Sequence, residues 1–272
     1  MHTSKFFLVA FVIMIAWLIM PVFLSAQSIW LNTGEDKFVA IEILKPNFDD
    51  NAFFGNNTTF ATSAIFLSGR ITLSDKLILV AELPFAHFGI EDFDDSENSI
   101  GNPYIGLESR KQGSPFFSEV GVRPPLADRG ALFVGSFSDF DRFEAFTPDL
   151  FTFSGKVNFR RKSVSNVVAR LRGGPNVLIP TEGGGDAEII LDYSAQVGYE
   201  GQQFSVMGGL TGRFVITEDG DIGDRTVHQL GAAAALHLGK VRPGIHFRLP
   251  LDDDLSNFID FVFGLHLGVH LK

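Results

Sequence analysis

The chain has 272 residues, of which 45% are hydrophobic, and 32 Asp and Glu against 22 Lys and Arg give a formal net charge of −10. This acidic balance lacks the basic footprint of a nucleic-acid-binding protein, so no nucleic-acid partner is expected. The sequence has no cysteine, which excludes disulfides and a lipid-attachment thiol as means of stability.

Residues 1–26 have the layout of a secretory signal peptide. Lys5 precedes an apolar run from Phe6 to Met20, and Pro21 and small residues follow up to Ala26. Cleavage after Ala26 leaves residues 27–272 as one mature domain. A retained membrane anchor is the alternative, because the apolar run approaches spanning length, but no basic cluster follows it.

Twelve segments after the leader alternate apolar and polar residues with period two, which is typical of strands. In chain order they are residues 37–45, 58–73, 76–88, 101–110, 116–124, 149–161, 164–178, 188–199, 203–217, 227–239, 241–250 and 258–271. In the last segment the odd positions from Ile259 to Leu271 are all apolar, and Asp260, His266 and His270 occupy the other face.

The connections between these segments alternate between short turns, such as SDK, RKS and GK, and long acidic loops, such as LDDDLSN. A soluble sandwich has no reason for this alternation, whereas an outer-membrane barrel has tight periplasmic turns and long outer loops. We therefore predict an all-β fold: a closed antiparallel up-and-down transmembrane β-barrel of about twelve strands. The sandwich remains the alternative, and it would hide Phe261, Phe263 and Leu265 in its interior.

In such a barrel the apolar faces contact lipid and the mixed faces line the lumen, because closure leaves no unpaired strand edge. The interfacial girdle depends on phenylalanine, since there are 29 Phe against three Tyr and two Trp. The acidic loops are either solvated or bound through divalent cations to lipopolysaccharide. The barrel-assembly machinery is expected to insert the protein, although the chain ends Leu271-Lys272 and not in the usual aromatic residue.

The strand parity assigns charged residues to the lumen, with acid weighted toward the first half of the chain and base toward the second. The predicted acidic wall is Glu42, Glu82, Glu108 and Glu119; the predicted basic wall is Lys156, Arg160, Arg170, Arg172, Arg213, Arg242 and Arg248; the predicted lumen histidines are His237, His246, His266 and His270. Opposed walls give a transverse field that orders polar solutes. Alternatively, Arg and Glu pair across a narrow bore and plug it.

Three further patterns leave alternatives open. The lumen histidines form either a metal or pH-responsive cluster or, more commonly, ordinary polar contacts. Residues 125–146, rich in Phe, fold inward as a constriction or form an exposed loop. The stretch DGDIGD (219–224) departs from a calcium loop, because Leu230 stands where a bidentate Glu belongs. We predict neither a metal nor a cofactor.

No catalytic motif is present: the sequence has no nucleophile elbow, zinc-spaced His pair or phosphate loop. A barrel lipid hydrolase would need a Ser activated by a histidine such as His266 or His270, and nothing couples either to a particular Ser. The protein is therefore predicted not to be an enzyme. A structural or adhesive barrel with a plugged lumen is the stronger alternative to a pore.

The runs RITLSDKLILVAELPFAHF, IGNPYIGLESR and GKVRPGIHFRLPL resemble uncharacterised Gram-negative outer-membrane transporter-type barrels, including proteins found near aromatic-compound degradation pathways. The resemblance spans most of the mature chain and is architectural. It implies a passive channel or substrate-selective transporter for small polar solutes, and the arginine excess in the lumen favours anionic ones.

Overall fold

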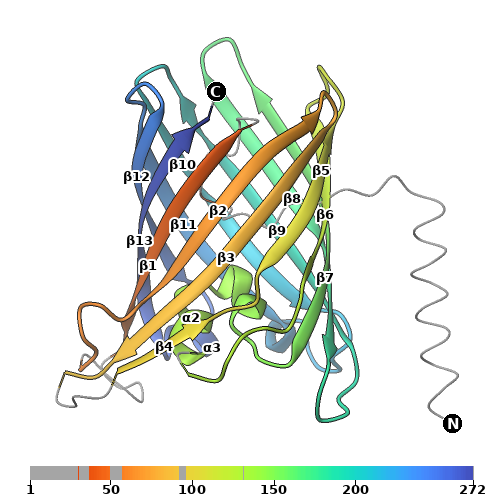
Figure 1. The fold of residues 1–272 in the computed structure, drawn as a ribbon, viewed down its shortest axis with the longest axis vertical. Helices are drawn as coiled ribbons and strands as arrows, with labels where there is room; N and C mark the ends of the chain where they lie inside the picture. Colours follow the sequence, from red (N-terminus) through yellow and green to blue (C-terminus); the bar gives the residue numbers. More distant parts are fainter. Residues whose placement is uncertain (1–29, 31–36, 50–56, 92–95, 131, 272) are drawn as a thin grey trace, which may run out of the picture.

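The computed structural model describes residue 30 and residues 37–49, 57–91, 96–130 and 132–271. The expected signal peptide, residues 1–26, lies outside these ranges. The described residues form one continuous antiparallel sheet that curves round into a barrel (Figure 1). Its strands are β1 (Phe38–Phe48), β2 (Ser63–Ser74), β3 (Leu77–Gly89), β4 (Ser96–Ile100), β5 (Tyr104–Arg110), β6 (Phe116–Arg123), β7 (Leu150–Lys162), β8 (Val167–Pro180), β9 (Glu188–Glu200), β10 (Phe204–Val215), β11 (Thr226–Leu236), β12 (Val241–Pro250) and β13 (Ile259–His270).

The barrel is closed by pairing between the first and last strands. Strand β1 pairs with β13 on one side and with β2 on the other, and β2 pairs with β3. Strand β3 pairs with β5, and from β5 to β13 each strand pairs with the next. The other described strand, β4, pairs with β3 alone, so twelve strands close the ring. The sequence-based prediction of a closed, twelve-stranded antiparallel barrel is confirmed.

The fourth predicted segment, residues 101–110, forms a strand only from Tyr104, and the sequence analysis missed the short strand β4, which lies just before that segment. Strand β5 pairs with the first half of β3, where Tyr104 lies opposite Glu82. Strand β4 pairs with the second half of β3, at Phe85–Gly89. The break falls at Gly101, Asn102 and Pro103. Proline has no N–H to donate to a neighbouring strand, so the ladder is interrupted there.

Short and long connections lie at opposite ends of the barrel. The turns after β2, β5, β7, β9 and β11 gather at the end that also holds the start of β1 and the end of β13, where the amide of Leu271 bonds to the carbonyl of Lys37 at 3.1 Å. This end is drawn at the top of Figure 1, and the longer connections lie at the bottom. We refer to these as the short-turn end and the long-loop end.

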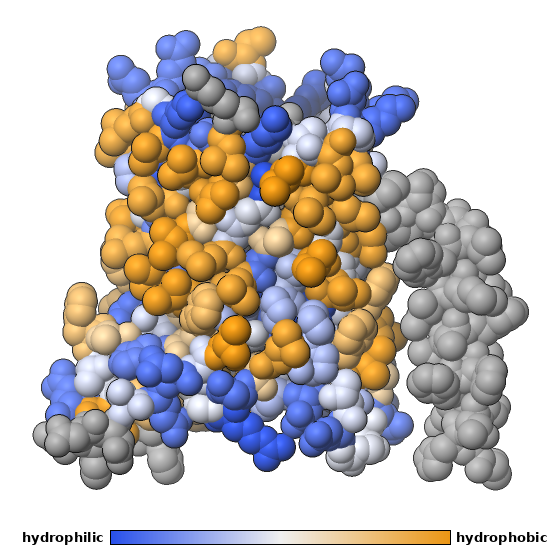
Figure 2. All heavy atoms as spheres, viewed as in Figure 1, coloured by the Kyte–Doolittle hydropathy of each residue, from blue (hydrophilic) through white to orange (hydrophobic). Residues whose placement is uncertain are grey.

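The outer surface of the barrel carries an apolar band between two polar rims (Figure 2). Phe263 and Leu265, which a soluble sandwich would bury, are 37% and 46% exposed to the surroundings. The strongly exposed aromatic residues of the described chain are one tyrosine, Tyr199, and the phenylalanines Phe60, Phe116, Phe204, Phe247, Phe258 and Phe263. The outward face of the wall is therefore the apolar face expected against lipid.

One predicted orientation is wrong. Asp260 was expected in the lumen and Ile259 outside, but Ile259 is buried and Asp260 is exposed, where it accepts a 2.9 Å hydrogen bond from Asn47. The register between β1 and β13 shifts at this point, with Asn47 opposite Phe261 and Phe48 opposite Ile259. A bulge adds one residue to a strand and so reverses the facing of every residue beyond it.

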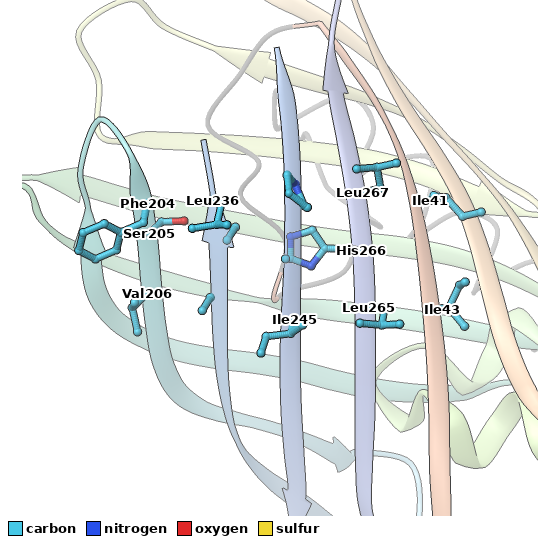
Figure 3. A pocket seen from close by; sticks show the side chains of 14 residues that line it. Ile41, Ile43, Phe204, Ser205, Val206, Leu236, Ile245, Leu265, His266 and Leu267 are labelled. Atoms are coloured by element: carbon cyan, nitrogen blue, oxygen red, sulfur yellow. The ribbon is translucent and has the colours of Figure 1, made fainter. Parts of the chain in front are cut away.

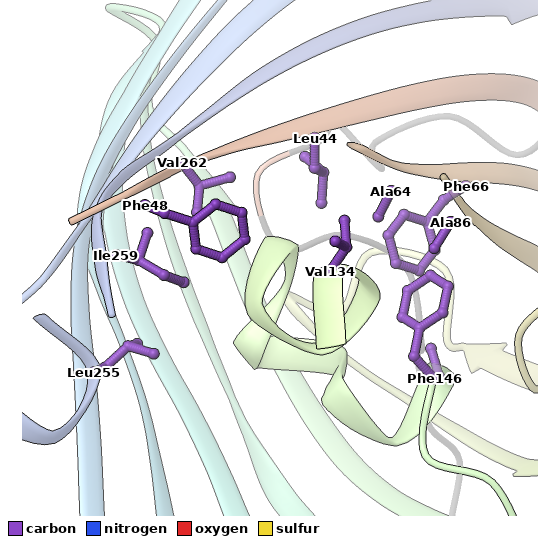
Figure 4. Packing of buried hydrophobic residues seen from close by; sticks show 11 residues of the cluster. Leu44, Phe48, Ala64, Phe66, Ala86, Val134, Phe146, Leu255, Ile259 and Val262 are labelled. Atoms are coloured by element: carbon purple, nitrogen blue, oxygen red, sulfur yellow. The ribbon is translucent and has the colours of Figure 1, made fainter. Parts of the chain in front are cut away.

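The helices of the described chain are short: α2 (Leu132–Ser138), η1 (Phe140–Ala145), η2 (Gly223–Arg225) and α3 (Asp253–Ser256). None of them is long and apolar enough to cross a membrane. Helices α2 and η1 lie inside the barrel toward its long-loop end (Figure 1). Val134 of α2 and Phe146 pack there against wall residues that include Leu44 and Phe66 (Figure 4). This end of the barrel is consequently filled by an apolar core.

Candidate functional site: the barrel lumen

The strands place the predicted acidic residues on the face opposite the exposed apolar side chains, where all four are buried: Glu42, Glu82, Glu108 and Glu119. Three of the predicted basic residues are buried: Lys156, Arg213 and Arg248. The other four are half-buried: Arg160, Arg170, Arg172 and Arg242. The histidines His246 and His266 are buried, and His237 and His270 are half-buried near the short-turn end. The role of these residues in function stays a prediction.

Ion pairs in the lumen join strands that are next to each other or next but one. Arg70 of β2 lies 2.7 Å from Glu108 of β5, and Arg123 of β6 lies 2.6 Å from Glu82 of β3. In the second half, Lys156 of β7 lies 2.6 Å from Asp192 of β9. Opposite charges are therefore paired within each half of the wall, and this pairing weakens any electric field across the bore.

Toward the short-turn end, two carboxylates are each shared by two arginines. Glu108 bonds to both Arg70 and Arg110, and Glu200 bonds to both Arg160 and Arg170. Two guanidinium groups therefore lie beside each of these carboxylates in a largely buried space, where charges interact more strongly than in open solvent.

Residues 132–149, here called the lumen segment, cross the bore between β6 and β7. Its central residue is Arg142, which is buried and lies 2.6 Å from Glu42 of β1, also bonding to Glu82 of β3 and to Asp139. The Arg142 guanidinium also lies 3.6 Å from the ring centre of Phe66 of β2. Arg142 thus attaches the segment to three adjacent strands of the first half.

The opposite side of the lumen segment is attached to the second half of the wall. Arg248 of β12 lies 2.6 Å from Asp139, and Arg213 of β10 lies 2.9 Å from Glu144. Gln229 of β11 donates to Asp141 at 3.2 Å. The segment is therefore a bridge held at both walls. Of the two alternatives for residues 125–146, the structure shows the inward-folded one.

The lumen segment lies outside the membrane-spanning strands, and its two aspartates titrate differently. Burial raises the pKa of Asp141 above its ordinary value. Burial acts in the same direction on Asp139, but the guanidinium groups of Arg142 and Arg248 outweigh it and hold the pKa of Asp139 well below the ordinary range. Asp139 is the ionised partner of both arginines at neutral pH.

Asn102 fixes both ends of the inward-folded connection, and the sequence analysis did not single it out. Its side-chain oxygen accepts from the amides of Leu126 and Ala127, both at 2.7 Å. Its side-chain nitrogen donates to the carbonyls of Glu144 and Thr147, at 2.9 and 2.7 Å. A break in a strand pattern at Gly-Asn-Pro is the signal that marks it. Gly101 allows this approach, because a Cβ there would lie 2.3 Å from the Ala145 carbonyl oxygen.

The lumen histidines do not form a metal centre in the described residues. The rings of His246 and His266 are 6.4 Å apart between centroids, and His246 Nδ1 lies 3.6 Å from Glu42 Oε1. No group of three His, Asp or Glu side chains able to hold a metal ion occurs in the part of the chain that is described. His237 lies 3.3 Å from Ser205 Oγ, and Ser205 is buried in the wall.

Trp30 also lies inside the barrel, which the sequence analysis did not foresee. It is buried, and its ring packs on Gly231 so closely that a Cβ there would lie 2.5 Å from the indole. Together with Arg170, Met207 and His266 it borders a small cavity in the lumen. A bulky apolar ring therefore narrows the bore between the lumen segment and the short-turn end.

A large apolar cavity lies elsewhere, on the outside of the wall. Residues of β1 and β10–β13, including Val206, Ile245 and Leu265, line a groove of about 590 Å³ (Figure 3). These three side chains are outward-facing and between 46% and 49% exposed. The groove belongs to the lipid-facing surface, so it is not the solute path.

Comparison with known proteins places this geometry in context. No protein-family model and no curated protein sequence matches the chain. An outer-membrane channel from Pseudomonas putida F1 superposes with a TM-score of 0.63 at 10% identity, covering 91% of this chain and 100% of the other. The NanC porin gives 0.54 at 8% identity, covering 86% and 100%, and the KdgM porin 0.52 at 8%, covering 86% and 99%. The chain therefore has the fold that these outer-membrane channels and porins share.

Proposed function

We propose that the protein is a passive or substrate-selective channel of the bacterial outer membrane for small polar solutes, with a preference for anions. The observation that carries the proposal is the lumen itself: a closed barrel, apolar outside, encloses a wall of arginines and carboxylates. A purely structural barrel would be more stable with an apolar core, because buried ion pairs seldom repay their desolvation. Retaining so many charges favours a polar path.

The preference for anions rests on the arginines near the short-turn end. The carboxylates of Glu108 and Glu200 are each shared by two guanidinium groups. Guanidinium binds carboxylate and phosphate through paired donors. The KdgM porin, which has a similar fold, has been solved in complex with disordered oligogalacturonate. In this proposal the acidic wall, from Glu42 to Glu119, and the opposed basic wall, from Lys156 to Arg248, both contact the solute as it moves along the bore.

The lumen segment acts in this proposal as the constriction that sets the size limit. It bridges the two walls at the long-loop end, while the shared guanidinium groups lie toward the short-turn end. The long acidic loops face the cell exterior, where they contact lipopolysaccharide, and the barrel-assembly machinery inserts the chain after export. The proposal assigns no catalytic role: His266 is buried, and the contact between a lumen histidine and a serine in the described chain is the 3.3 Å one from His237 Nε2 to Ser205 Oγ.

Planar-bilayer recording of the purified protein tests the proposal. We expect discrete conductance steps and a reversal potential in a KCl gradient that indicates anion selectivity. Changing Arg160 and Arg170 together to Gln should lower that selectivity. Cation selectivity of the unchanged protein would contradict the anion preference.

The second candidate is a structural or adhesive barrel with a plugged lumen. The bridge formed by Arg142 and Arg248 across the bore, together with Trp30, favours it. Absence of current at any voltage, in vesicles that contain correctly folded protein, would support this candidate. Phospholipid turnover by the purified protein would instead revive the hydrolase alternative.

A further inference from the structure

A polar cavity of about 580 Å³ opens at the short-turn end, bounded by the turn after β2, the turn after β5 and the end of β7. We call it the turn vestibule. It is lined by Lys76, Arg110, Lys111, Arg160 and Asp75, with Phe117 and small polar residues completing the wall. Four cationic side chains thus face one carboxylate. The vestibule is separate from the lumen segment, which lies toward the opposite end.

Backbone hydrogen bonds fix the walls of the turn vestibule. The amide of Arg110 donates to the carbonyl of Lys76 at 2.9 Å, and the amide of Arg160 donates to the carbonyl of Pro115 at 2.8 Å. The two turns and β7 are therefore held in one arrangement. A ligand that enters meets a main chain already in place, so little ordering of the backbone opposes binding.

The two arginines of the turn vestibule are partly exposed and partly paired. Each bonds to a carboxylate that another arginine shares: Arg110 to Glu108, and Arg160 to Glu200. Their side chains are 24% and 26% exposed, respectively. The Arg110 guanidinium also stacks on Phe117, with 4.5 Å to the ring centre, which fixes its plane. A guanidinium has five N–H donors, so the contact of Arg160 with Glu200 leaves other donors of Arg160 for an anion.

The two lysines provide charge at the rim of the turn vestibule. Lys76 and Lys111 are both exposed, and neither has an ion-pair partner among the described residues. Their flexible side chains can close over a ligand held by the two arginines. The nearest carboxylate in the lining, Asp75, is in the same turn as Lys76 and is also exposed.

We propose that the turn vestibule is a binding site for small, multiply charged anions, namely organic polycarboxylates or phosphate compounds, at the periplasmic mouth of the barrel. This proposal deepens the proposed function by naming a class of solute. The assignment of the vestibule to the periplasmic side rests on the proposed function, whereas the cavity and its lining do not depend on it. Several cations around a partly enclosed space favour ligands with two or more negative charges, because each added charge interacts with all of them.

Isothermal titration calorimetry of the full-length protein in neutral detergent tests the site. Citrate represents polycarboxylates, pyrophosphate represents phosphates, and acetate is the monovalent comparison. We expect citrate, pyrophosphate or both to bind, and acetate to bind at least about tenfold more weakly. Comparing the affinities for citrate and pyrophosphate shows whether the site prefers polycarboxylates or phosphate compounds.

The double variant Lys76→Gln and Lys111→Gln should weaken binding by about tenfold or more, whereas Lys240→Gln should leave it unchanged. Lys240 is a matched control, since it is exposed in another short turn at the same end and does not line the cavity. All three positions are on the surface of turns, and a heat-dependent shift on gels verifies folding. Equal binding by both variants, or no preference for multivalent anions, would overturn the proposal.

A bilayer measurement separates this proposal from the channel function. Citrate added on the short-turn side should block current at lower concentration than citrate added on the other side. If the protein conducts but neither binds nor is blocked, the vestibule proposal falls and the channel stands. If the protein binds citrate without conducting any current, the channel falls and the vestibule stands.

Discussion

Arg142 donates from Nη2 to Oε2 of Glu42 at 2.6 Å, although the two residues lie 100 positions apart in the chain. The same side chain also bonds to Glu82, so one guanidinium in the lumen segment is the counter-ion of two buried carboxylates in the wall. This contact converts a long connection into a bridge across the bore. Its consequences can be tested by substitution.

Replacing Arg142 with Ala should release the lumen segment. The change leaves Glu42, Glu82 and Asp139 buried without their shared cation, and breaking a buried pair in this way costs about 3–5 kcal/mol. We expect a larger single-channel conductance and faster proteolysis within residues 132–149. The matched control is Arg129→Ala, because Arg129 is 79% exposed in its pair with Asp149 and an exposed pair contributes little. An unchanged conductance with intact folding would show that the segment does not limit the path.

Replacing Asn102 with Ala should loosen the same segment from its ends. Four hydrogen bonds are lost, and each buried group left unsatisfied costs about 1–3 kcal/mol. Urea unfolding in lipid vesicles should show reduced stability, together with faster proteolysis after residue 126. Asn98→Ala is the control, because Asn98 is exposed on β4 and its side-chain oxygen lies 2.9 Å from Nδ1 of His87 at the surface. Equal stability of the two variants would rule out the clamp.

Docking of the lumen segment should depend on pH in two opposite ways. Asp141 has a raised pKa, so the docked form binds its proton more tightly and docking strengthens as pH falls toward that titration. Asp139 has a depressed pKa, so docking is fully present above the ordinary carboxyl pKa of about 3.9 and is lost as pH falls through the depressed value. Conductance should therefore fall slightly on mild acidification and rise only at strongly acid pH. Asp141→Asn should abolish the first change and preserve the second.

Leu265→Arg should destabilise the folded protein in vesicles by about 2–4 kcal/mol, because it places a cation on the lipid face in the middle of β13. Leu271→Arg is the comparison at the rim, just beyond β13, where the same charge is expected to cost about 0–1 kcal/mol. The measurement is reversible folding into vesicles followed by tryptophan fluorescence. Similar costs at both positions would contradict a lipid-facing strand with this depth.

The sequence by itself determined the barrel. Period-two alternation set which side chains share a face, and the alternation of short and long connections set which strand ends lie together. Both are local properties of the chain, because strand facing follows from the pleat and hairpin pairing from turn length. The short strand β4, just before the fourth predicted segment, and the reversal at Asp260 were missed, since a break or a bulge depends on what the neighbouring strand and the lumen segment offer.

Tertiary structure alone decided what fills the bore. Residues 125–146 read as either a constriction or a loop, and only the curvature of the closed wall brings Glu42, Glu82, Arg213 and Arg248 within reach of the Asp139–Glu144 stretch. The mixture of Phe and charged residues in this stretch marked it as unusual, but it did not indicate whether the stretch folds into the bore or outward. Ion-pair choice depends on distances between strands far apart in sequence, and those distances exist only after the sheet has closed.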